Sequence, residues 1–189
     1  MRNKGFTLIE LMIVTLMIGI LSAIAVPSWA AFVNRQRVYS ANDAILRALR
    51  RTQSEAKRTK LSYSISFKTE SSVPKFAVYP AGSTPSIWES PISEIKPGQL
   101  IIGTNLTAEN TAGSSLVYGS ATAQTITLDY RGVLVPDPNL GPNQVGLIVV
   151  VAAPKPGTTQ AIDASRRCTR VLTLLGASVA GKENECNAQ

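Results

Sequence analysis

The sequence predicts an α+β protein in which one long N-terminal helix precedes a head of antiparallel strands. No charged side chain occurs from Leu11 to Val33, and a helix that crosses a membrane needs about 20 mainly apolar residues. Apolar residues then recur at helical spacing from Trp29 to Lys60. After Lys60, apolar and polar residues alternate, which is typical of strands. We therefore expect a transmembrane helix at 6–33, an amphipathic helix at 34–60 and a β-rich head at 61–189.

The chain begins with a short basic leader, followed by an apolar run that carries one acidic residue. Two basic residues precede Gly5, and Glu10 is the only charged residue in the run that ends at Val33. A carboxylate inside a membrane segment costs a few kcal/mol or more, so Glu10 is expected to have a function. A secretory signal carries its small-residue cleavage site after the apolar region, whereas Gly5 lies before it. Cleavage at Gly5 would remove residues 1–5 and retain the helix.

Residues Lys4–Leu11, with the sequence KGFTLIEL, resemble the class III signal of type IV pilins and type II secretion pseudopilins. The resemblance implies that a prepilin peptidase cuts after Gly5 and that Phe6, the new N-terminus, is N-methylated. It also implies that Glu10 pairs with the N-terminal amine of a neighbouring subunit during filament assembly. The alternative is a plain N-terminal anchor in which Glu10 reaches the membrane interface.

The resemblance also implies a location and a set of partners. Basic residues flank both ends of the apolar run, so they do not set its orientation. Similarity to pilins places the N-terminus in the cytoplasm and the head in the periplasm, with a single span in the inner membrane. The implied partners are the prepilin peptidase, other pilin or pseudopilin subunits, the inner-membrane assembly platform and the lipid bilayer.

Pro27 lies inside the predicted helix. A proline in a helix interior removes a hydrogen bond and kinks the axis, and pilins often carry one near this point. The alternative is that Pro27 ends the membrane helix, that Ser28 caps a second helix and that Trp29 marks the membrane interface.

The amphipathic part of the helix carries most of the positive charge. Residues 35–60 have a net charge of +6 and residues 61–189 are balanced, so the pI near 9.7 does not indicate a nucleic-acid-binding head. We expect the apolar face to pack on the head and the basic face to lie toward solvent, anionic lipid or neighbouring subunits. The apolar face comprises Val38, Ala41, Ile45, Ala48, Leu49, Thr52 and Ala56, and the basic face comprises Arg47, Arg50, Arg51 and Arg58.

The remaining sequence predicts strands separated by loops rich in Pro, Gly and Ser. The expected strands are Leu61–Phe67, Lys75–Tyr79, Gln99–Ile102, Thr125–Tyr130, Val133–Val135, Val145–Ala152 and Arg170–Leu175. The expected loops are Pro80–Pro97 and Pro136–Pro142. A tight turn at Arg131-Gly132 would place Gly132 at positive φ.

Three short motifs resemble the GspH/FimT pseudopilin family and hence its type IV pilin fold. They are the helix end Arg47–Ala56, the strand that follows it, and the turn Leu128–Gly132. Residues 80–122 match no part of the family pattern. The family closes with a glycine–arginine strand whose arginines contact DNA in some members that take up DNA. Here the corresponding stretch, Leu175–Val179, has no arginine after the glycine. The candidate nucleic-acid contact is instead a basic group offset by Asp163, Glu183 and Glu185. It consists of Arg166, Arg167, Arg170 and Lys182.

Cys168 and Cys186 are the only cysteines. Export to an oxidising compartment favours a disulfide between them, and the bond resembles the C-terminal disulfide loop of many pilins. The alternative is a buried Cys168 and a free Cys186.

Catalysis has little support in this composition. The chain has no histidine and only two cysteines, which excludes His-dependent nucleophilic sites, His-ligated metals and Cys₄ sites. No phosphate-binding or dinucleotide-binding motif occurs. We expect no catalytic residue, metal or cofactor. The sequence predicts a minor pilin or pseudopilin that helps to start or cap a type IV pilus or a type II secretion pseudopilus. The alternatives are a DNA-uptake minor pilin and a membrane-anchored enzyme.

Overall fold

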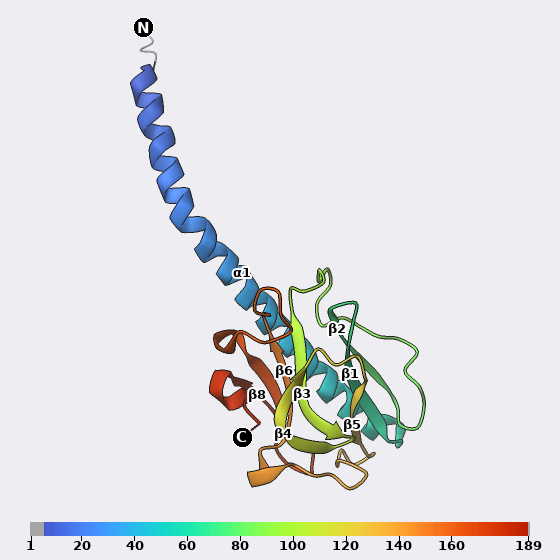
Figure 1. The fold of residues 1–189 in the computed structure, drawn as a ribbon. Helices are drawn as coiled ribbons and strands as arrows, with labels where there is room; N and C mark the ends of the chain where they lie inside the picture. The colour runs from blue at the N-terminus through green and yellow to red at the C-terminus, as the bar shows by residue number, and fades with distance from the viewer. Residues whose placement is uncertain (1–5, 189) are drawn as a thin grey trace. The chain divides into compact units, whose positions relative to one another are not determined.

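The computed structural model describes residues 6–188, with the side chains of residues 26–28 and 143 outside that description. The chain divides into two compact units, Met1–Arg35 and Gln36–Gln189. A long N-terminal helix is followed by antiparallel sheets, as predicted (Figure 1). The helix and strands are α1 (Leu8–Thr59), β1 (Tyr63–Glu70), β2 (Val73–Pro80), β3 (Ile101–Ala108), β4 (Thr111–Tyr118), β5 (Gln124–Leu128), β6 (Leu147–Ala152), β7 (Arg167–Val171) and β8 (Ser178–Lys182). Three short 3₁₀ helices are η1 (Pro142–Gln144), η2 (Asp163–Ser165) and η3 (Glu183–Cys186).

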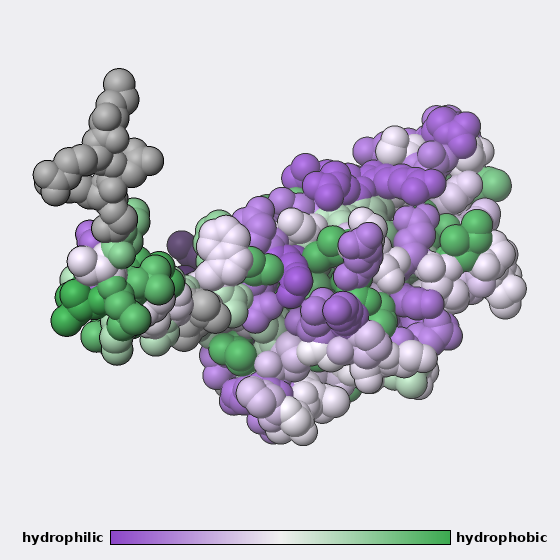
Figure 2. All heavy atoms as spheres, turned by 90° about the horizontal axis from the view of Figure 1, so that it is seen from above, coloured by the Kyte–Doolittle hydropathy of each residue, from purple (hydrophilic) through white to green (hydrophobic). Residues whose placement is uncertain are grey.

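In the first unit, residues 8–25 form an exposed apolar helix. Every side chain from Phe6 to Ala25 is exposed, and Figure 2 shows this segment mainly as hydrophobic spheres. By length and composition, α1 is the one helix among residues 6–188 that could cross a membrane. The helix continues through position 27. Pro27 therefore does not end the apolar helix, and Ser28 does not cap a second one.

Within the second unit, residues 36–59 of α1 contribute one face to the core. All seven residues of the predicted apolar face are buried, including Ile45 and Ala56 at 0% exposure. Burying a side chain the size of isoleucine stabilises a protein by about 1.5–3 kcal/mol. The buried Thr52 hydroxyl donates to the Ala48 carbonyl at 2.9 Å, so it leaves no unpaired polar group. The four predicted basic residues are exposed, which confirms the amphipathic interpretation.

Two antiparallel sheets pack against this part of α1 (Figure 1). The first has the strand order β2-β1-β5 and the second has the order β4-β3-β6-β7-β8. In the predicted β1–β2 hairpin, Tyr63 pairs with Pro80 and Glu70 pairs with Val73. Ile65 and Phe67 of β1 join the hydrophobic core with Ile45 of α1. Ser66, which lies between them, and Ser64 therefore face away from α1.

The stretch 80–122 is more ordered than the sequence indicated. Of the expected strand Gln99–Ile102, only the last two residues are in a strand, because β3 begins at Ile101 and continues to Ala108. β4 returns from it after a turn at Glu109-Asn110. Small residues in this hairpin interrupt the apolar alternation that predicts strands, and packing requires one of them to be glycine. A Cβ atom on Gly103 would lie 2.5 Å from the Tyr118 ring, so the ring can lie on β3 only because position 103 is glycine.

Two other expected strands are displaced. Arg170–Leu175 was predicted as a strand, but β7 is Arg167–Val171 and a turn follows it, with the Gly176 N–H donating to the Thr173 carbonyl at 3.0 Å. Residues Val133–Val135 form only an isolated bridge, between Leu134 and Leu128. Apolar side chains at 171, 172, 174 and 175 gave a strand-like pattern, although the chain turns within it.

β6 is buried on both faces. Leu147, Val149 and Val151 lie in the core that contains α1. Ile148 and Val150 lie on the opposite face, in a second cluster with Cys168 and Cys186. The continuous apolar sequence of this strand follows from that double burial.

Candidate functional site

The predicted assembly site lies at the start of α1. Gly5 is outside the described residues. Phe6 and Glu10 are exposed, and the Glu10 N–H donates to the Thr7 hydroxyl at 3.3 Å in the first turn. The positive end of the helix dipole favours a carboxylate there. Within residues 6–188, no cation forms an ion pair with Glu10.

The predicted turn at Arg131-Gly132 is organised by Asp129. One carboxylate oxygen accepts the Arg131 N–H at 2.9 Å and the Val133 N–H at 2.8 Å, and the other accepts the Arg131 Nε–H at 3.1 Å. Burial alone would raise the pKa of the Asp129 carboxyl. The hydrogen bonds from Val133 and Arg131, with the Arg131 charge, outweigh that effect and hold the pKa below its usual value.

Gln53 joins this turn to a second one. Its amide donates to the Gly132 carbonyl and to the Leu175 carbonyl, each at 3.3 Å. Gly132 has φ +87° and Gly176 has φ +73°, a region that glycine enters readily. A Cβ atom at Gly176 would lie 2.7 Å from the Gly132 carbonyl oxygen. The two turns therefore pack closely and are anchored to α1.

Replacing Asp129 with asparagine should lower the melting temperature at neutral pH, because the amide cannot accept all three hydrogen bonds. A carboxylate whose pKa is lowered by folding stabilises the protein above its unfolded pKa, about 3.9 for aspartate. That stabilisation is lost as the pH falls through the lower pKa of the folded state. The difference between wild type and Asp129→Asn should therefore shrink with acidity. Thermal unfolding of the full chain in detergent, from about pH 7 to about pH 3, measures it.

Asp137→Asn is the matched control, since Asp137 is exposed in a nearby loop. This variant should have the same melting temperature as the wild type at every pH in the series. A difference between Asp129→Asn and wild type that is constant across this pH range would contradict the assigned role of the carboxylate.

The two cysteines form a disulfide. Their Cα atoms are 5.5 Å apart, within the range that the bond requires, and both residues are 0% exposed. Cys168 lies on β7 and Cys186 ends η3. The bond therefore fixes η3 over the outer face of β6 and β7.

The four candidate DNA-contacting residues do not form one open patch. Arg167 stacks on the Tyr39 ring at 4.3 Å and donates to its hydroxyl, on the α1 side of β7. Arg170 belongs to the opposite face, with Cys168, and donates to the Val145 carbonyl at 2.9 Å. Arg166 pairs with Asp163 and donates to the Asn187 amide oxygen at 2.9 Å. Lys182 alone is exposed.

Two features of the head were not predicted: a set of ion pairs on α1 and a row of hydroxyl side chains. Arg51 lies 3.9 Å from Glu89, a residue of the 80–122 stretch, and Glu55 pairs with Arg58 at 2.7 Å. A row of hydroxyl side chains also lines the outer face of the β2-β1-β5 sheet. The alternating Ser64 and Ser66 are the sequence signal for that row, although alternation by itself predicts only a half-buried strand.

The N-terminal segment is similar to that of type IV pilins. Residues 1–26 match the prokaryotic N-terminal methylation motif. The chain is 61% identical over 36 residues to the type IV major pilin protein PilA of Myxococcus xanthus strain DK1622, which covers 19% of this chain and 16% of that protein. It is 60% identical over 36 residues to the type IV major fimbrial protein FimA of Dichelobacter nodosus, covering 19% and 23%. The chain thus matches about a sixth to a quarter of the length of these relatives.

Among solved structures, the type IV minor pilin FimU of Pseudomonas aeruginosa strain PAO1 is similar to this chain. The two share 16% sequence identity and superpose with a TM-score of 0.49, over 80% of this chain and 93% of FimU.

Proposed function

We propose that this chain is a minor pilin or pseudopilin, a structural subunit that helps to start or cap a type IV pilus or a type II secretion pseudopilus. The observation that carries the proposal is Glu10, a lone carboxylate in the first turn of an exposed apolar helix, within the matched methylation motif. The motifs that resemble the GspH/FimT family support the same assignment. Its role is assembly, and we assign it no catalytic residue and no cofactor.

The proposed assembly step depends on charge compensation. A prepilin peptidase would cut after Gly5 and the new Phe6 amine would be methylated. In the bilayer the Glu10 carboxylate is costly until a cation lies beside it. The Phe6 amine of a neighbouring subunit would supply that cation. Breaking a buried pair by removing one partner costs about 3–5 kcal/mol, which is enough to bias a subunit against joining a filament.

The proposed topology follows from the same segment. The helix would cross the inner membrane once, with the leader in the cytoplasm and the head in the periplasm. The assembly platform would engage the membrane segment, and Pro27 would kink it. Exposed apolar side chains from Phe6 to Ala25 would lie in lipid or against other helices. A DNA-contacting head is less well supported, because Arg166, Arg167 and Arg170 are engaged within the head.

Glu10→Ala tests the proposal. The variant should insert and lose its leader normally, because the cleavage motif and the apolar length are unchanged, but it should be depleted from filaments at least tenfold relative to wild type. Quantitative immunoblots of sheared filament fractions and of membranes, from cells that express wild type or variant, measure the ratio.

Thr15→Ala is the matched control. It removes another polar side chain from the same helix, and the Thr15 hydroxyl bonds only its own helix, at the Met12 carbonyl (2.9 Å). This variant should be incorporated like wild type. Equal incorporation of Glu10→Ala and Thr15→Ala would show that the carboxylate has no part in assembly.

A further inference from the structure

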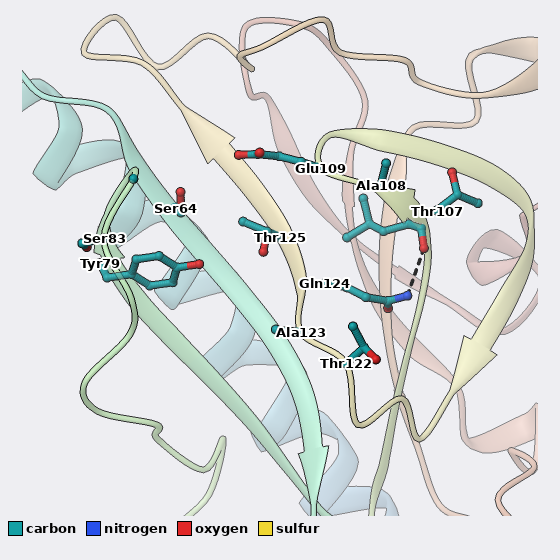
Figure 3. Close-up of a pocket in the computed structure, with 12 residues that line it drawn as sticks. Ser64, Tyr79, Ser83, Thr107, Ala108, Glu109, Thr122, Ala123, Gln124 and Thr125 are labelled. Carbon is teal, nitrogen blue, oxygen red and sulfur yellow. Dashed lines mark hydrogen bonds between the residues drawn. The ribbon is translucent and has the colours of Figure 1, made fainter.

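We propose that a polar hollow on the outer face of the β2-β1-β5 sheet binds a neutral sugar ring through its hydroxyl groups. The hollow has a volume of about 330 Å³. Its floor includes Ser64, Tyr79 and Thr125, and the β3–β4 turn with Glu109 forms one wall (Figure 3). Small-molecule sites span about 300–1,000 Å³, so this volume suits one ring better than an extended chain.

The floor is polar although it is covered. The strand register places Tyr79, Ser64 and Thr127 in one row, and Ser66 and Thr125 in the next. Ser64 and Thr127 are each 3% exposed and Ser66 is 0% exposed. A buried hydroxyl without a partner costs about 2–7 kcal/mol, so a covered sheet face is normally apolar. Here its side chains are small and polar, which leaves both space and hydrogen-bonding groups.

The buried hydroxyls are held by one another. The Ser66 hydroxyl lies 2.6 Å from both the Tyr79 hydroxyl and the Thr125 hydroxyl. The Ser64 hydroxyl lies 2.7 Å from that of Thr127, which donates to the Glu109 carboxylate. Each hydroxyl has one donor and two acceptor positions. Because Thr127 donates to Glu109, Ser64 must donate to Thr127, so that row keeps only acceptor positions. The three hydroxyls of the Ser66 row form two hydrogen bonds, so that row keeps one donor as well as acceptor positions. Among the described residues, none donates to the second Glu109 carboxylate oxygen.

Several polar side chains that line the hollow point into it. In Figure 3 the Tyr79 hydroxyl and the Glu109 carboxylate point toward it from opposite sides, with Ser64 and Thr125 between them. Glu109 and Ser83 are exposed at its edge, so the hollow opens to solvent. The Gln124 amide is already committed, because its oxygen accepts from Thr104 and its nitrogen donates to the Leu106 carbonyl at 3.0 Å.

These groups select the class of ligand. One carboxylate and no basic side chain line the hollow, which disfavours an anion. Adjacent hydroxyls of a sugar donate to the carboxylate and also exchange hydrogen bonds with Tyr79 and Thr125. An alkyl ammonium only donates, so it leaves the remaining donor of the Ser66 row unmatched. A neutral polyhydroxylated ring therefore fits the lining best.

Saturation-transfer NMR on the full chain in a zwitterionic detergent tests this inference, since that detergent carries no sugar headgroup. The probes are glucose, galactose and N-acetylglucosamine, each at millimolar concentration. At least one should receive saturation from wild type. Glu109→Gln should weaken its binding about tenfold, because a charge-assisted hydrogen bond becomes a neutral one. The amide oxygen still accepts from Thr127, and an unchanged melting temperature shows that the variant is folded.

Two further variants decide the location. Ala123→Trp introduces a bulky ring at an exposed lining position and should abolish binding without touching the hydroxyl rows. Glu94→Gln removes an exposed carboxylate outside the hollow and should bind like wild type. The inference is overturned if no sugar receives saturation from wild type, if Ala123→Trp and Glu109→Gln bind as wild type does, or if the amine of lysine amide binds in place of the sugars.

Discussion

Replacing Gly5 with valine is expected to abolish removal of the leader, so that the membrane form keeps the mass of the whole chain. In the proposed function, the peptidase recognises the small residue between the basic leader and the apolar helix. A branched side chain at position 5 would block that recognition and leave Phe6 without a free amine to methylate. Intact-mass measurement of the membrane fraction separates the full-length form from a form that begins at methylated Phe6.

Gly19→Val is the control for this experiment. It makes the same substitution in α1, at a position where an added Cβ meets no other atom within 4 Å, so its leader should be removed as in wild type. A wild-type mature N-terminus downstream of Val33 would instead identify an ordinary secreted protein and remove the basis of the proposed function.

Loss of the disulfide should be the largest change in stability among single substitutions in the head. The bond closes a loop with a sequence separation of 18, and a 15-residue loop corresponds to about 3 kcal/mol of chain entropy. For a domain of this size that equals a fall in melting temperature of about 6–12 °C. The melting temperatures of Cys168→Ser and Cys186→Ser should fall by similar amounts, since each substitution breaks the same bond. Thermal unfolding of the full chain in detergent measures both.

Reductant supplies the control for that experiment. It should lower the melting temperature of wild type toward that of the double variant Cys168→Ala/Cys186→Ala, and should leave the double variant unchanged. Two reactive thiols in wild-type protein purified without reductant would refute the bond.

The parts of the fold that were predictable are those with a long, uniform pattern. The apolar face of α1 repeats over several turns, and β1 alternates cleanly from Tyr63 to Phe67. The hairpin of β3 and β4 was missed because Gly103 and other small residues replace the apolar repeat, for a reason that lies in Tyr118 on the neighbouring strand. The periodicity of a sequence indicates which face of a helix or strand a residue lies on. It does not indicate which side chain of a neighbouring strand packs against that residue.

The same distinction applies to the candidate sites. Gly5, Phe6 and Glu10 can be recognised from the sequence, because their proposed roles depend on the order of residues within one short segment. The basic group near the C-terminal strand was misleading, since closeness in sequence placed Arg167 and Arg170 together while the strand sends them to opposite faces. The hollow beside Glu109 was not predictable, because four separate segments contribute to it.

The double burial of β6 has a consequence for the order in which the head is completed. Its inner face is covered by α1, which precedes it in the chain, but its outer face is covered by η3, which follows it. Leu116, Tyr118 and Val145, which precede β6, also pack against Ile148 and Val150, so in the proposed export route this cluster is begun early but completed only when the segment that ends with Cys186 has also crossed the membrane. In that route the native packing of the sheet is complete only after almost the whole chain has been exported, because the covering segment is the last one to emerge.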